Sequence, residues 1–263
     1  MYTGPHLPQS ENICLSITPA RFNNTTSSSW YKNGILVSAT NYQTWDVSGL
    51  NLPIGFYSNV SNDGSGTSIL RIGNGSTKLQ TGSITVNMWF DLADFDINVG
   101  GNNNWRALLW CNGGTAGYPV TMVLEQSRGI NFSTGHTDRY RRYLNGSFTP
   151  ITADQQDFQM ITYTYDKSTG TAACYKDGSL VRSGAMTTDT SGNNATSAGT
   201  ALSYSNYTTA GFGHGGTNTG SNPSGEGLIP GYWGVSQFWN VALTSDEVAE
   251  VYNKTKIAYE FSS

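Results

Sequence analysis

The stretch Pro230-Gly-Tyr-Trp-Gly-Val-Ser-Gln-Phe-Trp-Asn-Val-Ala-Leu-Thr-Ser-Asp-Glu-Val-Ala-Glu-Val-Tyr-Asn-Lys-Thr-Lys256 decides the fold, because a strand period changes there to a helix period. Alternation over residues 232–241 predicts a strand with one face made of Trp233, Val235, Gln237, Trp239 and Val241. Thr244 stands three residues before Glu247, which is the capping-box spacing, and a short apolar face follows at Val248, Val251 and Tyr252. We therefore expect a core strand that ends in a short capped helix.

The bulk composition predicts one large all-β domain. The chain has 263 residues, of which 37% are hydrophobic and only 12% are charged, so Gly, Ser, Thr and Asn supply the polar balance. A net charge of −4 gives no basic footprint and argues against a nucleic-acid partner. Residues 1–6 lack a signal-peptide pattern and no run reaches the ~18 apolar residues of a membrane span, so no membrane partner is expected. The low charge favours a chain held in an assembly, with other proteins or as a homo-oligomer.

Short apolar runs separated by turn residues predict many antiparallel strands. The clearest hairpin joins residues 157–166 to residues 171–176, and Gly178 favours a second tight turn directly after it. Residues 25–29 and 211–216 are interpreted as loops, the first polar and the second rich in glycine. Residues 1–263 are thus expected to form a single domain with a short N-terminal arm over about residues 1–10. The fold class is all-β, a two-sheet antiparallel jelly-roll sandwich with one short C-terminal helix. The cysteines show no metal-site spacing and are predicted as buried free thiols: Cys14, Cys111 and Cys174.

Three blocks resemble the laminin-G-like, concanavalin A-like jelly roll of the lectin and glucanase type. They are residues 82–90, the hairpin at 158–178 with its Tyr-Asp and Tyr-Lys-Asp-Gly ends, and the closing residues 231–252. The chain is most similar to a subgroup encoded by tailed bacteriophages, many of them cyanophages, and its opening residues 1–5 and Tyr252-Asn-Lys-Thr-Lys256 carry that likeness. The resemblance implies a virion structural protein on the particle surface, as a capsid decoration or as part of the tail or a tail fibre.

Two groups of residues are candidate binding sites. Asp91, Asp94 and Asp96 gather at the end of a predicted strand, where carboxylates with loop carbonyls suit Ca²⁺; the alternative is a solvated loop that ends the strand. The segment Arg139, Tyr140, Arg141, Arg142 and Tyr143 is the one concentrated basic and aromatic stretch. It could stack sugars or pair with an acidic partner surface, and the alternative is an ordinary hairpin with packed Tyr and solvated Arg side chains.

Catalytic motifs are missing from the sequence, so the chain is predicted not to be an enzyme. The Glu-x-Asp-x-x-Glu strand of glycosidases with this fold does not occur, and His136 and His214 accompany no Gly-x-Ser-x-Gly elbow. The favoured function is adhesion to other capsid or tail proteins on the virion surface, with no cofactor other than Ca²⁺. The alternative is a carbohydrate-binding module that recognises host-surface glycans, and a glycoside hydrolase is the outsider.

Overall fold

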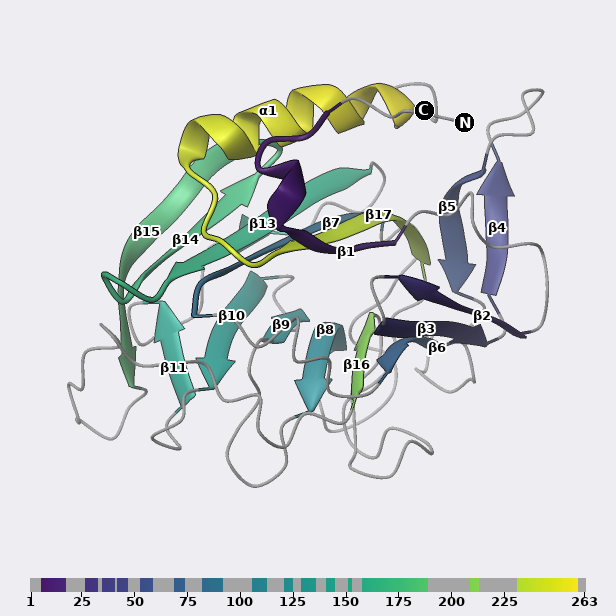
Figure 1. Cartoon of the computed structure of the whole chain (residues 1–263), viewed down its shortest axis with the longest axis horizontal. Coiled ribbons are helices and arrows are strands. Elements are labelled where there is room, and N and C mark those ends of the chain that lie inside the picture. The colour runs from purple at the N-terminus through teal and green to yellow at the C-terminus, as the bar shows by residue number, and fades with distance from the viewer. Residues whose placement is uncertain are drawn as a thin grey trace.

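The computed structural model describes residues 6–17, 27–32, 35–40, 42–46, 53–58, 69–73, 82–91, 106–112, 121–124, 129–135, 141–144, 151–152, 158–188, 209–212 and 231–259. Strands dominate this part of the chain, and they form two layers with one α-helix outside them (Figure 1). No helix in the described part is both long and apolar enough to cross a membrane.

Sheet A is an antiparallel sheet that carries the closing strand β17 near its middle. β17 (Gly231–Trp239) pairs on one side with β7 and on the other with β1 and β5, and β13, β14 and β15 continue the sheet beyond β7. Its other members are β1 (Ile13–Ile17), β4 (Tyr42–Asp46), β5 (Pro53–Ser58), β7 (Ile84–Asp91), β13 (Gln159–Asp166), β14 (Thr171–Lys176) and β15 (Ser179–Thr188).

Sheet B forms the opposite layer and is also antiparallel. Its pairing order is β2, β3, β6, β16, β8, β9, β10 and β11, with β12 (Ile151–Thr152) on β10, and β11 pairs with the last residues of β15. β15 thus belongs to both sheets and joins them at one side of the sandwich. The bounds are β2 (Ser27–Lys32), β3 (Ile35–Thr40), β6 (Ile69–Gly73), β8 (Arg106–Asn112), β9 (Thr121–Leu124), β10 (Gly129–Gly135), β11 (Arg141–Leu144) and β16 (Thr209–Phe212).

The core between the two sheets follows from strand alternation. Tyr163 of β13 stacks on Phe132 of β10 with ring centroids 5.2 Å apart, which joins sheet A to sheet B. Val86 is the direct partner of Tyr163 on β7, and directly paired residues share a face. The alternate residues Ile84, Val86, Met88 and Phe90 therefore fill the inter-sheet core, and all four are buried.

The outer face of sheet A is covered by α1 (Ser245–Thr255). Val248 and Val251 of the helix pack on Trp89, Tyr175 and Trp239. Around this cluster lie Met160, Ala173, Leu243 and Tyr259, with Val235, Val241 and Tyr252 partly buried against it. The predicted capping box is confirmed, because the Thr244 hydroxyl accepts from Glu247 N–H and the Glu247 carboxylate accepts from Thr244 N–H.

The structure confirms the predicted fold class, the central hairpin of β13 and β14, and the second tight turn that follows it, whose residues Asp177 and Gly178 have φ of 50° and 77°. Cys14 and Cys174 are buried free thiols as predicted, while the side chain of Cys111 lies outside the described residues. Two loop interpretations are wrong in part: residues 27–29 belong to β2, and residues 211–212 belong to β16. Both segments sit inside ladders with neighbouring strands, and backbone pairing there outweighs their local turn composition.

Candidate functional site

The basic and aromatic segment lies in sheet B as far as the structure describes it. Arg141, Arg142 and Tyr143 open β11, an interior strand with β10 on one side and β15 on the other. Arg142 is paired with Thr134 and Thr188, and Tyr143 with Ser133 and Thr187. Arg139 and Tyr140 lie outside the described residues, so the segment as a five-residue site stays a prediction.

The acidic cluster is described at one position only. Asp91 ends β7, is paired with Tyr232 of β17, and is 9% exposed. Asp94 and Asp96 lie outside the described residues. Within the described ranges, no group of three or more His, Cys, Asp or Glu side chains could hold a metal ion. A Ca²⁺ site at this strand end therefore remains a prediction.

The described residues of the two candidate sites are not brought together. Asp91 lies at the end of sheet A where Phe90 meets Gln159 and Lys176 meets Ser179. β11 pairs with residues 186–188 of β15, beyond the opposite end of the sheet, where Thr171 meets Ala185. β13, β14 and β15 separate β7 from β11 along the ladder.

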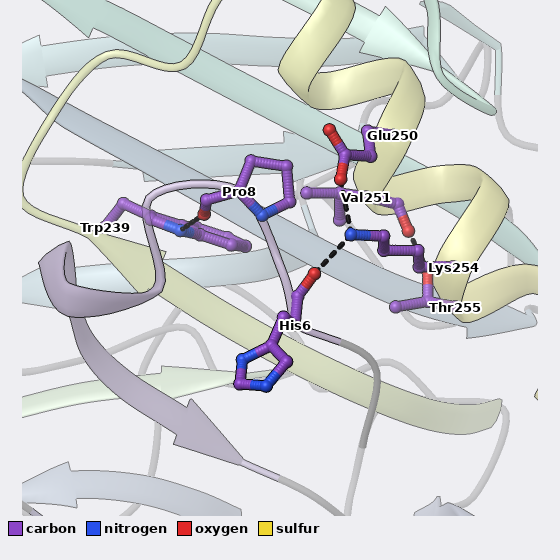
Figure 2. Close-up of polar contacts among 7 residues, drawn as sticks. All are labelled: His6, Pro8, Trp239, Glu250, Val251, Lys254 and Thr255. Carbon is purple, nitrogen blue, oxygen red and sulfur yellow. Dashed lines mark hydrogen bonds and ion pairs between the residues drawn. The ribbon is translucent and has the colours of Figure 1, made fainter. Parts of the chain in front are cut away.

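The aromatic cluster on the outer face of sheet A is covered by the chain itself. Figure 2 shows the N-terminal segment beside α1, with the Trp239 indole N–H donating to Pro8 O at 3.0 Å and Lys254 bonded to both His6 O and Glu250. Further along the helix, Gln9 Nε2 donates to Glu247 Oε1 at 2.8 Å. We define residues 6–12 as the N-terminal strap. Because the strap and α1 cover the aromatic cluster, a ligand could reach these cluster residues only after local unfolding.

A row of buried polar side chains crosses three strands beneath this cover. Gln237, Asn87 and Thr162 occupy paired positions on β17, β7 and β13, with Asn87 Nδ2 donating to Gln237 Oε1 at 3.3 Å and Thr162 Oγ1 donating to Asn87 Oδ1 at 2.8 Å. Thr85 lies two residues before Asn87 on β7. Its Oγ1 donates to Val241 O at 2.8 Å and accepts from Leu243 N–H at 2.9 Å. These side chains satisfy their hydrogen-bonding groups within the protein. We therefore infer that they fix the register of the three strands and the path of the chain after β17, and that they are not catalytic or binding residues. Sequence reasoning missed this row; its one signal was the pair of polar residues at alternate positions of β7, Thr85 and Asn87.

The described acidic side chains have structural partners instead of the paired geometry of a hydrolase. Asp166 accepts hydrogen bonds from Ser168, Thr169 and Ser83 at the hairpin turn. Burial alone would raise the pKa of Asp166, but these hydrogen bonds outweigh it and lower that pKa. Asp177 accepts from Met160 N–H at 2.8 Å, at the far end of β14 from Asp166. Asp166 and Asp177 therefore do not share a cleft as a glycosidase pair would.

Buried groups elsewhere are held in their neutral forms. Burial raises the pKa of the Cys14 thiol to about 12, although nearby backbone hydrogen bonds oppose that rise. Burial likewise raises the pKa of Tyr259, whose hydroxyl accepts from Val235 N–H at 2.6 Å. A thiol with such a pKa is not a nucleophile at neutral pH, so Cys14 acts as an apolar core residue.

Comparisons with known proteins bear on the fold alone. No family model matches the chain, and no curated protein matches it. A botulinum neurotoxin serotype D/C binding domain is similar in structure, with a TM-score of 0.57 and 12% identity over 93% of this chain and 52% of that one. The same binding domain in complex with rat synaptotagmin II gives a TM-score of 0.56 and 11% identity. The sialidase of Trypanosoma rangeli gives a TM-score of 0.59 and 10% identity over 95% of this chain and 34% of that one.

The chain spans about half the length of the neurotoxin binding domains that it matches. The likenesses are compatible with a concanavalin A-like fold, and they carry no information on a bacteriophage origin. At these identities they show a shared architecture, and the chain has the β-sandwich fold of these domains.

Proposed function

We propose that this chain is a non-catalytic binding domain that acts by adhesion. One observation carries the proposal: α1 and the N-terminal strap cover the aromatic cluster on the outer face of sheet A, and Asp166, Asp177 and Glu247 serve turns and the helix cap. We place the contact with a partner on sheet B, where the Arg141–Tyr143 positions lie. The structurally similar domains include ones described in complex with rat synaptotagmin II and with SialylT, which supports a binding role for this architecture.

The setting we propose is the surface of a bacteriophage virion, with capsid or tail proteins as the partners. It rests on the sequence resemblance to phage-encoded jelly rolls and on the low charged fraction of 12%. Mass spectrometry of purified virions tests it directly. We expect the chain among the virion proteins at a copy number that matches a capsid or tail component. Intact virions that lack it would contradict this setting and leave the binding function to be tested separately.

The second candidate is recognition of host-surface glycans by the same surface. The observation that favours it is the similar domain described in complex with SialylT. Arginine and tyrosine supply the hydrogen bonds and stacking faces that sugars need, and Arg141, Arg142 and Tyr143 open one interior strand of sheet B. A separate Ca²⁺ site at Asp91, Asp94 and Asp96, where β7 ends, accompanies this candidate.

A glycan array, read with and without Ca²⁺, tests the glycan candidate. We expect a signal that Arg141→Ala and Tyr143→Ala reduce about tenfold or more, the range of a lost bidentate or stacked contact. Arg106→Ala is the matched control, because Arg106 opens β8, another strand of the same sheet. Equal losses in Arg106→Ala and Arg141→Ala would point to a general charge effect, and a blank array would contradict glycan recognition. Release of free sugar from any bound glycan would contradict the non-catalytic assignment.

A further inference from the structure

Among the described strands, none pairs with the outer side of the first half of β15, which is therefore an open edge of sheet A. Residues 179–185 pair with β14 on one side, and the pairing with β11 begins only at Met186. Five of these seven residues are exposed: Ser179, Leu180, Val181, Ser183 and Ala185. Leu180 and Val181 are 50% and 40% exposed, which makes them two of the three exposed large hydrophobic residues in the described part of the chain. An apolar open edge of this kind invites the addition of another strand.

The backbone groups of this edge point toward solvent at alternate residues. Met186 N–H donates to Gly170 O at 3.0 Å, so residue 186 directs its backbone groups toward the β14 side. By the two-residue period of a strand, Ser183 and Ala185 direct their N–H and C=O groups the other way. These two residues therefore offer the hydrogen bonds that an added strand would use.

Arg182 lies in the middle of this edge and faces inward. It is paired with Cys174, which is fully buried and lies between Ala173 and Tyr175 on β14. Ala173 and Tyr175 belong to the cluster under α1, so Cys174 and Arg182 point to the other face, toward sheet B. Arg182 is partly buried and makes contacts within its own chain. A strand added at this edge would cover its guanidinium further and remove water from the charge.

Pairing with a second copy would be opposed by the same residue. Residues 186–188 are already paired with β11, so only residues 179–185 are open to another chain. An antiparallel two-fold pair that uses this whole stretch is centred on residue 182. Because the backbone groups of Arg182 point toward β14, that centre is a non-hydrogen-bonded pair, in which the two Cα atoms approach to about 4.5 Å. Two guanidinium groups would then face each other directly, which is destabilising.

A bulge adds to this effect. The register with β14 shifts between Cys174 and Tyr175, which leaves Val181 without a direct partner on β14. A bulge increases the local twist and disturbs the regular spacing that an incoming strand requires. We propose that Arg182, assisted by this bulge, is a gatekeeper that prevents strand addition at the open edge of sheet A and keeps a second copy of this chain from pairing there.

Self-association of purified variants tests the gatekeeper. We expect wild type to be monomeric through this edge and Arg182→Val to self-associate at least about tenfold more tightly, measured by light scattering across a concentration series. Arg182→Lys keeps the charge and is the matched control, so it should behave as wild type. Ser183→Pro removes an outward N–H without touching the bonds to β14, and the double variant Arg182→Val, Ser183→Pro should be monomeric again.

Folding of each variant is checked by circular dichroism and thermal melting. If Arg182→Val does not fold, Arg182→Gln takes its place. The glutamine side chain is longer than that of valine, so it keeps more of the packing of Arg182, and it is neutral. A folded neutral variant that stays as monomeric as Arg182→Lys overturns the proposal. So does a wild-type dimer that Ser183→Pro dissociates, since the edge would then be a working interface.

Discussion

Replacement of Gly234 by alanine tests how the end of the chain closes over sheet A. A Cβ at this position would lie 2.6 Å from Tyr259 Cζ and 2.8 Å from Trp89 Cβ, and it would also run into Tyr259 Oη. The Tyr259 ring cannot move away freely, because it stacks on the Trp89 ring with centroids 4.4 Å apart and packs against the Phe158 ring with centroids 4.7 Å apart. Gly234→Ala must therefore displace the Tyr259 ring and break the hydrogen bond that the Tyr259 hydroxyl accepts from Val235 N–H.

The expected cost follows from these contacts. Overpacking of a well-filled core costs about 1–3 kcal/mol, and the lost hydrogen bond adds about 1 kcal/mol. The lower entropy of an unfolded chain with alanine offsets about 0.4–1 kcal/mol of that cost. We therefore expect Gly234→Ala to lower the free energy of unfolding by roughly 1–3 kcal/mol, and Tm by about 3–10 °C. Chemical denaturation followed by tryptophan fluorescence measures the change, since Trp89 lies in the affected cluster.

Two further variants show whether the steric reasoning holds. Gly82→Ala is the matched control, because its Cβ would meet only side-chain carbons of Lys167, the nearest at 2.5 Å, and that flexible chain can move aside. Its cost should stay within about 0.5 kcal/mol. Tyr259→Phe removes the hydroxyl, so the double variant with Gly234→Ala should cost about 1 kcal/mol less than the sum of the single changes. Strict additivity, or a Gly234→Ala protein as stable as wild type, would refute the reasoning.

Three other predictions concern the helix cap, a turn and a thiol. Burial would raise the pKa of Glu247, but hydrogen bonds from Thr244 and Gln9 outweigh burial and lower that pKa. The ionised Glu247 carboxylate therefore stabilises the fold at pH values above the usual pKa of 4.5, and this stabilisation is lost as pH falls through the depressed pKa. The stability advantage of wild type over Glu247→Gln should thus be present at pH 7 and vanish in acid; an advantage that grows in acid would contradict the cap. Gly178→Ala should cost about 1–2 kcal/mol or more in denaturant unfolding, since φ there is 77° and a Cβ would lie 2.8 Å from Tyr252 Cβ; a neutral change would exclude this strain. In a Cys111→Ser background, the thiol of Cys14 should react with a thiol reagent only as fast as the protein unfolds, because it is 8% exposed with a pKa of about 12, and prompt reaction of the native protein would show otherwise.

The elements that could be predicted from sequence are those with strong local signals. The capped helix was predictable because Thr244 and Glu247 satisfy each other through short-range bonds that any chain context preserves. The hairpin of β13 and β14 was predictable because period-two alternation coincides with a turn, and the following Asp177-Gly178 turn suits two residues with positive φ.

The rest depends on long-range pairing that no local pattern contains. β16 runs into the glycine-rich segment 211–216, yet residues 209–212 are a strand because β6 and β8 flank them on both sides. The polar row of Gln237, Asn87 and Thr162 forms only when three strands take one register. The same holds for the candidate site. The sequence showed that the segment around Arg142 is basic, but its position between Thr134 and Thr188 depends on the pairing of strands in sheet B.

The position of β17 near the middle of sheet A has a consequence for biosynthesis. Ile13 pairs with Trp239 and Phe56 pairs with Trp233, so strands made early have their partner at the far end of the chain. Until residue 239 has been synthesised, β1, β5 and β7 all lack β17, the strand with which each of them pairs. Their edges are then open to other nascent chains. Contacts so distant in sequence also close slowly. Growth at lower temperature or with more chaperone should therefore raise the soluble yield, and chains cut short before β17 should be recovered in aggregates.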